Sequence, residues 1–163
     1  PSKNKLIKHI KIKSIIQSII SDKQSNMWLS YYQTVAKFDT NGNQIASQHL
    51  KTNLSDLILD SKRNKIWIGT SNKNTKLYYY DFQTLKIDSI ETGISSDFYK
   101  TLSLDSKNRL WIGTLGGLVV LYNSGNIFEI DLSSTDLNLN LSIASDALDT
   151  SSLKKISLFE YKE

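Results

Sequence analysis

The sequence predicts an all-β protein made of repeated units of four short strands, and three observations support this. The motif Trp-Ile-Gly-Thr occurs twice, at Trp67–Thr70 and Trp111–Thr114, each time after an Asp-Ser-Lys turn. A weaker copy contains Trp28, so the tryptophans at 28, 67 and 111 are 39 and 44 residues apart. No long window has a helical period, and the chain has one proline. Repeats of about 40–45 residues built of short apolar strands are typical of β-propeller blades. The 163 residues correspond to about four four-stranded blades, or to a segment of a larger ring.

The second unit, residues 54–90, shows the expected order of elements. The apolar stretch from Leu54 to Asp60 suits an inner strand that is buried on both faces. The tract Asp60–Asn64 predicts a tight turn, because Asp accepts hydrogen bonds from nearby amides and Asn tolerates positive φ. Ile66–Ile68 is the second strand, and Gly69 after it allows a close neighbour. We expect the third and fourth strands at Lys76–Asp81 and Leu85–Ile90.

The first and third units, residues 14–50 and 98–132, repeat this order. In the first unit we expect strands at Ile15–Ser21, Met27–Ser30, Val35–Asp39 and Gln44–Leu50, with an Asn41-Gly42 hairpin between the last two. In the third unit we expect strands at Thr101–Leu104, Leu110–Thr114, Gly117–Tyr122 and Ile127–Leu132.

The two ends are the least regular parts of the chain. A strand is expected over Leu6–Ile12, and others near 137–143 and 156–159. One interpretation is a single domain over 1–163 in which residues 1–13 and 137–163 form a composite or degenerate blade. The other is that both ends belong to a larger ring. The start at Pro1, with no leader before it, favours a mature or excised segment.

Eight residues recur at fixed places in the units and are expected to be structural. The tryptophans should pack between blades, the aspartates should close turns, and the glycines should admit close neighbours. These residues are Asp22, Trp28, Asp60, Trp67, Gly69, Asp105, Trp111 and Gly113.

The third unit carries the most specific pattern. Asp105, Asn108, Leu110–Thr114 and Gly116–Leu118 resemble the two-component regulator propeller repeat. The second unit keeps Asp60 and Ile66–Thr70, and the first keeps Asp22 and Trp28. This resemblance implies a sensor propeller on the periplasmic side of bacterial hybrid histidine kinases, often detecting glycan fragments, or a propeller in secretion machinery. Streptogramin-lyase propellers are a more distant resemblance. The implied location is periplasmic or extracellular.

Several kinds of chemistry are not expected. The chain has no cysteine, which excludes disulfides and thiolate metal sites. The net charge of +4 comes from scattered lysines, so no nucleic-acid face is predicted. No apolar run is long enough for insertion into a membrane. The Asp39–Asn43 tract begins like a calcium loop, but its glycine stands at the fourth position, and Leu50 replaces the bidentate Glu. We therefore expect a turn, and neither a metal nor a cofactor.

Propeller geometry predicts where recognition takes place. Loops between second and third strands, and between fourth strands and the next first strands, should converge on one face around the axis. The candidate ligand-binding residues there are Tyr31, Tyr32, Asn72, Lys73, Asn74, Phe98, Tyr99 and Gly116. The leading hypothesis is a non-enzymatic sensor that recognises a ligand, glycans among them, or a protein partner. The alternatives are a scaffold propeller completed by further blades and, third, a propeller lyase or hydrolase.

Overall fold

The computed structural model describes residues 9–71, 76–92, 99–114, 118–121 and 127–130, with side chains described as far as Thr114. This part of the chain is all-β and contains no helix. It forms three antiparallel four-stranded sheets, each a simple meander in chain order, which are the expected blades. Blade one contains β1 (Ile16–Ser21), β2 (Met27–Tyr31), β3 (Thr34–Phe38) and β4 (Gln44–His49). Blade two contains β5 (Leu54–Asp60), β6 (Lys65–Thr70), β7 (Lys76–Asp81) and β8 (Lys86–Glu91). Blade three contains β9 (Tyr99–Leu104), β10 (Leu110–Thr114), β11 (Leu118–Leu121) and β12 (Ile127–Ile130).

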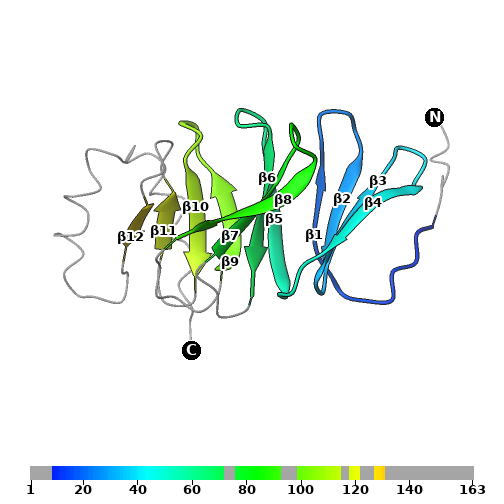
Figure 1. The fold of residues 1–163 in the computed structure, drawn as a ribbon, viewed down its shortest axis with the longest axis horizontal. Coiled ribbons are helices and arrows are strands. Elements are labelled where there is room, and N and C mark those ends of the chain that lie inside the picture. Colours follow the sequence, from blue (N-terminus) through cyan, green and yellow to red (C-terminus); the bar gives the residue numbers. More distant parts are fainter. Residues whose placement is uncertain (1–8, 72–75, 93–98, 115–117, 122–126, 131–163) are drawn as a thin grey trace, which may run out of the picture.

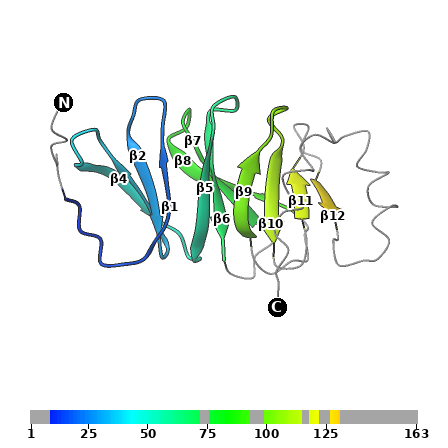
Figure 2. The same ribbon diagram turned by 180° about the vertical axis from the view of Figure 1, so that it is seen from behind.

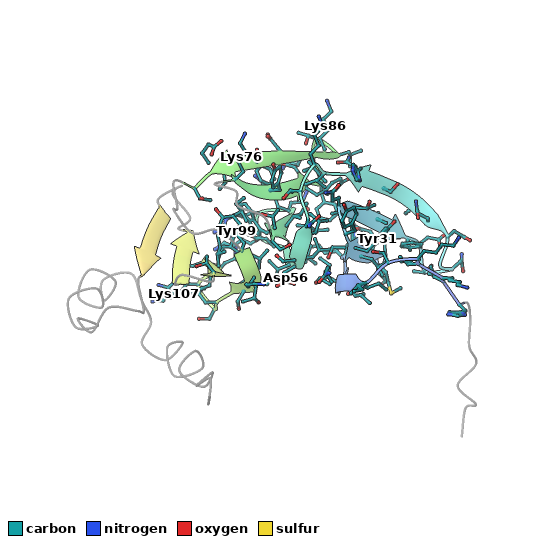
Figure 3. The ribbon with its side chains drawn as sticks, turned by 90° about the horizontal axis from the view of Figure 1, so that it is seen from below. Tyr31, Asp56, Lys76, Lys86, Tyr99 and Lys107 are labelled. Carbon is teal, nitrogen blue, oxygen red and sulfur yellow. The ribbon has the colours of Figure 1, made fainter. Side chains whose placement is uncertain are left out.

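The three sheets stand side by side, with the first strand of each blade next to that of its neighbour (Figures 1 and 2). Seen from below, Asp56 on β5 lies on the inner side, whereas Lys76 and Lys86 lie on the outer side (Figure 3). The connections β1–β2, β5–β6 and β9–β10 form one edge, which we call the turn face. The connections β2–β3 and β4–β5 lie at the opposite edge, which we call the loop face (Figure 1).

Each interface between blades is built around a tryptophan. Trp28 is 3% exposed and packs with Leu54, Leu57, Ile66 and Ile68 of blade two. Its ring centroid is 4.7 Å from that of Tyr80 and 5.8 Å from that of Phe82. Trp67 is 4% exposed and clusters in the same way with Tyr99, Leu102, Leu110 and Ile112 of blade three. The tryptophans are therefore core residues, as expected.

The repeated glycine has a steric reason. A Cβ atom at Gly69 would lie 2.7 Å from Oγ of Ser55, and one at Gly113 would lie 2.7 Å from Cγ2 of Thr101. Both neighbours are on the adjacent inner strand, β5 or β9. Because real Cβ atoms do not approach this closely, glycine allows β6 to lie against the side chain of Ser55 and β10 to lie against that of Thr101.

The N-terminal segment differs from the expectation. A strand was predicted over Leu6–Ile12, but residues 9–13 are not in a strand. Ile10 and Ile12 instead pack against Leu29, Ala36 and Phe38. Side chains alternate across a strand, so this cluster lies on the side of blade one opposite to Trp28. Residues 9–13 are therefore held against blade one by hydrophobic contact with a sheet face, and not by strand pairing.

The composite blade expected from residues 1–13 and 137–163 falls mostly outside the described residues, and it stays a prediction.

In the described part of the chain, no helix has the length and apolar character needed to cross a membrane.

Candidate functional site

The loop face is held together by hydrogen bonds from the connection between blades one and two. Tyr32 and Gln33 form the two-residue turn between β2 and β3. The carbonyl of Tyr32 accepts from Leu54 N at 2.8 Å, and that of Gln33 accepts from Leu50 N at 2.7 Å. Nε2 of Gln33 donates to Oδ1 of Asn53 at 3.2 Å. The turn is thus fastened at its backbone and its side chain to the chain that enters blade two.

Tyr32 occupies an unusual position within this turn. Its φ is 48°, in the left-handed region that normally favours glycine. Its side chain is 58% exposed, so packing does not compensate for the strain. A non-glycine residue in this conformation costs of the order of 1–2 kcal/mol. The fold therefore holds a solvent-exposed aromatic ring in a strained conformation at the loop face.

The other predicted site residues are distributed differently from the expectation. Tyr31 is half-buried and ends β2, next to Tyr32. Tyr99 was expected in an exposed entry loop, but it is the first residue of β9 and is 1% exposed. Its hydroxyl lies 2.5 Å from Oγ1 of Thr92, and its ring belongs to the core between blades two and three (Figure 3). The expectation for Tyr99 was wrong because its large ring is buried in this core. Five candidates lie outside the described residues: Asn72, Lys73, Asn74, Phe98 and Gly116.

On the turn face, each blade has an aspartate that holds its own tryptophan. One carboxylate oxygen of Asp22, Asp60 and Asp105 accepts from Nε1 of Trp28, Trp67 and Trp111, at 3.0 Å in each case. The other oxygen accepts from turn amides, among them Asn26 N at 2.9 Å and Arg109 N at 2.8 Å. A single residue therefore closes the turn and orients the indole.

Each of these carboxylates also has a cation beside it. Nζ of Lys37 is 3.2 Å from Asp22, Nε of Arg109 is 2.5 Å from Asp105, and Arg63 pairs with Asp60. Burial raises the pKa of Asp22, but hydrogen bonds from Trp28 and Asn26 and the contact with Lys37 outweigh it and lower the pKa to about 2. At Asp60 and Asp105, too, burial raises the pKa, but hydrogen bonds outweigh this effect and lower the pKa. These ionised carboxylates stabilise the fold, because the indoles, the turn amides and the neighbouring cations all contact them.

A carboxylate on the inner strands, which the repeat pattern does not indicate, links all three blades. Oδ1 of Asp56 accepts from Oγ of Ser18 on β1 at 3.0 Å. Oδ2 accepts from the amide of Leu102 at 2.9 Å and from Oγ1 of Thr101 at 3.3 Å, both on β9. Asp56 on β5 thus joins the inner strands of its two neighbours (Figure 3).

The remaining candidates for chemistry have structural surroundings. The tract that begins like a calcium loop is a turn, in which Asp39 Oδ1 accepts from Asn41 N at 2.9 Å and Asn43 N at 2.7 Å. His49 is exposed, with Nδ1 3.5 Å from Oγ1 of Thr34. Within the described residues, neither histidine forms an ion pair, and no group of three potential metal ligands is found.

Comparison with known proteins defines the class of this fold. Residues 93–116 match the family model "Two component regulator propeller", which covers the third repeat as far as Gly116. No curated protein matches the sequence significantly. The resemblance expected from Asp105–Gly116 is therefore confirmed for this repeat.

Solved structures match over a larger part of the chain. A streptogramin B lyase structure is 19% identical, with a TM-score of 0.63, over 77% of this chain and 43% of that one. The extracellular domain of a hybrid two component system from B. thetaiotaomicron is 26% identical, with a TM-score of 0.60, over 75% of this chain and 17% of that one. A second such domain from B. thetaiotaomicron is 15% identical, with a TM-score of 0.61, over 71% and 17%.

These matches establish the architecture. The fold is that of β-propeller blades, and part of its third repeat matches the two component regulator propeller model. The chain spans less than half the length of the lyase and about one sixth of the length of the two Bacteroides domains.

Proposed function

We propose that this chain is a non-catalytic recognition module of the sensor type, which acts outside the cytoplasm and binds through its loop face. The proposal is supported by its similarity to extracellular domains of two component systems, one of them at 26% identity. It is also supported by the third repeat. The streptogramin B lyase structure, at 19% identity, shares the fold alone.

The observation that carries the proposal is the conformation of Tyr32. Strained backbone persists where the surrounding structure enforces it, and it is concentrated at functional sites. Here the enforcement comes from Leu50, Leu54 and Asn53, while the ring itself is exposed. A rigidly presented aromatic ring contributes contact area at little cost in entropy. Beside it, Gln33 and Asn53 supply amide groups for hydrogen bonding.

The ligand is proposed to be either a glycan or a protein segment that covers this ring. Asn72, Lys73, Asn74, Phe98 and Gly116 lie in the sequence between described strands and remain proposed contributors. Rings with adjacent amides suit sugars, because sugars present both apolar faces and hydroxyl groups. The experiment below tests glycans directly as the ligand class.

The test uses replacement of Tyr32 by glycine. Glycine accepts the positive φ, so we expect Tyr32→Gly to change the free energy of unfolding by no more than about 1 kcal/mol. A panel of soluble oligosaccharides is screened by thermal shift and then by calorimetry. Members that bind the wild type should lose at least about tenfold in affinity for Tyr32→Gly.

Leu85→Gly is the matched control. Leu85 is also an exposed residue with positive φ, 58°, but it lies in the β7–β8 turn, away from the loop face. It should leave oligosaccharide affinity unchanged. Equal binding by wild type and Tyr32→Gly would contradict the proposed site, and no binding by any member would remove glycans as the ligand class.

A scaffold role is the second candidate, and one observation favours it. Ile16, Ile19 and Met27 on blade one are 40%, 55% and 39% exposed. In the registered pairing Met27 stands opposite Phe38 and Ile19 opposite Leu29, so these residues border the cluster covered by Ile10 and Ile12. Exposed apolar patches mark interaction surfaces. For the patch on blade one, we propose further propeller blades as the partner.

A further inference from the structure

The groove between the outer strands of blades one and two has the features of a peptide-binding site. One chamber of about 310 Å³ has Trp28, Val35 and Tyr80 among its lining residues. Ala46 and Gln48 of β4 line it on one side, and Leu85 and Ile87 of blade two line it on the other. A chamber of this volume lies at the lower end of the range for small-ligand pockets.

A second chamber continues the groove along the same strands. Its volume is about 430 Å³, and Gln48 and Ile87 line both chambers. Its lining includes Lys51, Asp88 and Ser89. The groove therefore changes from an aromatic, apolar section to a polar one along β4, which suits an extended occupant more than a compact one.

The strand β4 that borders this groove is an unprotected edge. In the described sheets it pairs with β3 and ends the order of blade one. Its sequence, Gln44–His49, contains no Asp, Glu, Lys or Arg, and five of its six residues are exposed. The corresponding outer strand of blade two, β8, carries Lys86, Asp88 and Glu91. Charged residues on edge strands are a common protection against pairing with another chain, and β4 lacks them.

The rim of the groove is strained as well as apolar. Leu85 is 64% exposed, and its φ of 58° lies in the left-handed region. Its amide is held by the carbonyl of Asp81 at 2.8 Å. Ile45, at the irregular start of β4, is 54% exposed. Two large apolar side chains are therefore presented to solvent beside the free edge.

From these features we propose that β4 and this groove bind an extended, uncharged peptide segment of a partner protein. The segment adds to the free edge as a further strand over Ala46–His49. Paired residues in a sheet share a face, so the peptide residues opposite Ala46 and Gln48 point into the groove. Main-chain hydrogen bonds then provide affinity, and the apolar chamber selects an apolar side chain at alternate positions. This site is separate from the loop face of the proposed function.

The test begins with a displayed library of random octapeptides. They are selected on the full chain and counter-selected on Ala46→Arg, in which a long charged side chain enters the chamber. We expect enrichment of uncharged sequences with apolar residues at every second position. Affinity should fall at least about tenfold for Ala46→Arg. The matched control is Gln44→Arg at the start of the same strand. Gln44 lines neither chamber, and its partner Phe38 lies on the face away from Trp28, so this variant should change affinity less than about threefold.

N-methylated peptides then test the mode of binding. In an antiparallel pair, only alternate residues exchange main-chain hydrogen bonds with the neighbouring strand. Methylation of one alternate set of amides should abolish binding, and methylation of the other set should be tolerated. Equal effects of both sets would overturn strand addition, as would failure to enrich any peptide.

Two further variants separate this site from the alternatives. Leu85→Gly should weaken peptide binding, and Tyr32→Gly should not. The reverse pattern would overturn the assignment to the groove. Light scattering of the wild type, with Ala46→Arg beside it, tests pairing of β4 with a second copy. A dimer that this substitution abolishes would replace the proposed partner by self-association.

Discussion

At the scale of single residues, the repeated aspartate has more than one task. Its sequence context, Asp-Ser-Lys at Asp60 and Asp105 and Asp-Lys-Gln at Asp22, predicts only a turn. The structure adds the indole hydrogen bond at 3.0 Å in all three blades and a cation beside each carboxylate. Together these contacts make the ionised form of each aspartate the one that the fold requires.

The stability of the protein should consequently depend on acid pH. The pKa of Asp22 is lowered to about 2, and those of Asp60 and Asp105 are also lowered. A lowered folded-state pKa contributes stability above the unfolded value of 3.8, and this contribution is lost as the pH falls toward the folded value. We expect the free energy of unfolding, from urea titrations, to decrease between about pH 5 and about pH 2.

Two variants identify the source of this dependence. Asp22→Asn should make it weaker. Glu91→Gln, which removes an exposed carboxylate paired with Lys76 at 3.2 Å, should leave it nearly unchanged, because exposed pairs contribute little. An unaltered pH dependence in Asp22→Asn would show that this carboxylate is not responsible.

At the scale of elements, the second strand of blades two and three lies close against a side chain of the first strand. The registers place Gly113 opposite Thr101 and Leu54 opposite Thr70, with a shift in the pairing of β5 with β6 and of β9 with β10. The close approach explains why glycine recurs two residues after the tryptophan in β6 and β10. Blade one has Ser30 at this place, opposite Ser18, whose small side chain fits the same approach.

This contact predicts a specific rescue. Gly113→Ala introduces a Cβ atom 2.7 Å from Cγ2 of Thr101, and overpacking of this kind costs about 1–3 kcal/mol. Thr101→Ser removes that methyl group but keeps the hydroxyl that donates to Asp56. In urea unfolding, the double variant should be more stable than Gly113→Ala alone. Additive costs would mean that the methyl group is not the obstacle.

At the scale of the whole molecule, the blades are neighbours in a row, and we expect their interfaces to carry the cooperativity of unfolding. Trp28 and Trp67 supply the apolar part of two interfaces. Asp56 supplies a polar link across both of them, through Ser18 on one side and Leu102 on the other. In repeat architectures, stability is approximately the sum of the stabilities of the units and of their interfaces.

Removal of this link should loosen the coupling between blades. Asp56→Ala leaves the donors of Ser18 and Leu102 without their acceptor, and we expect a loss of about 1–3 kcal/mol. Because both interfaces weaken, hydrogen exchange should show the three blades opening separately from one another. As a control, Asp88→Ala removes an exposed carboxylate on β8 and should keep a single transition. Cooperative unfolding of Asp56→Ala at wild-type stability would contradict this role.

The sequence by itself determined the blades. Strand order, the turns after Asp22, Asp60 and Asp105, the core role of the tryptophans and the glycine approach all follow from local chemistry and from repetition. An alternating or continuous apolar run indicates how a strand is buried, and an Asp followed three or four residues later by an Asn favours a tight turn. These properties depend on residues close together in the chain, so a single sequence is sufficient to predict them.

Only the tertiary structure decided which of the remaining residues face solvent and which face one another. Tyr99 and Tyr32 are both aromatic residues near strand ends, yet one is 1% exposed and the other 58%. The difference arises because blade two covers Tyr99, whereas the connection at Leu50–Leu54 anchors the backbone of Tyr32 and leaves its ring free. The link through Asp56, the packing of Ile10 and Ile12 on blade one and the groove beside β4 likewise join residues of different units. Such contacts depend on how neighbouring sheets are placed, and the local pattern of residues carries no information about that placement.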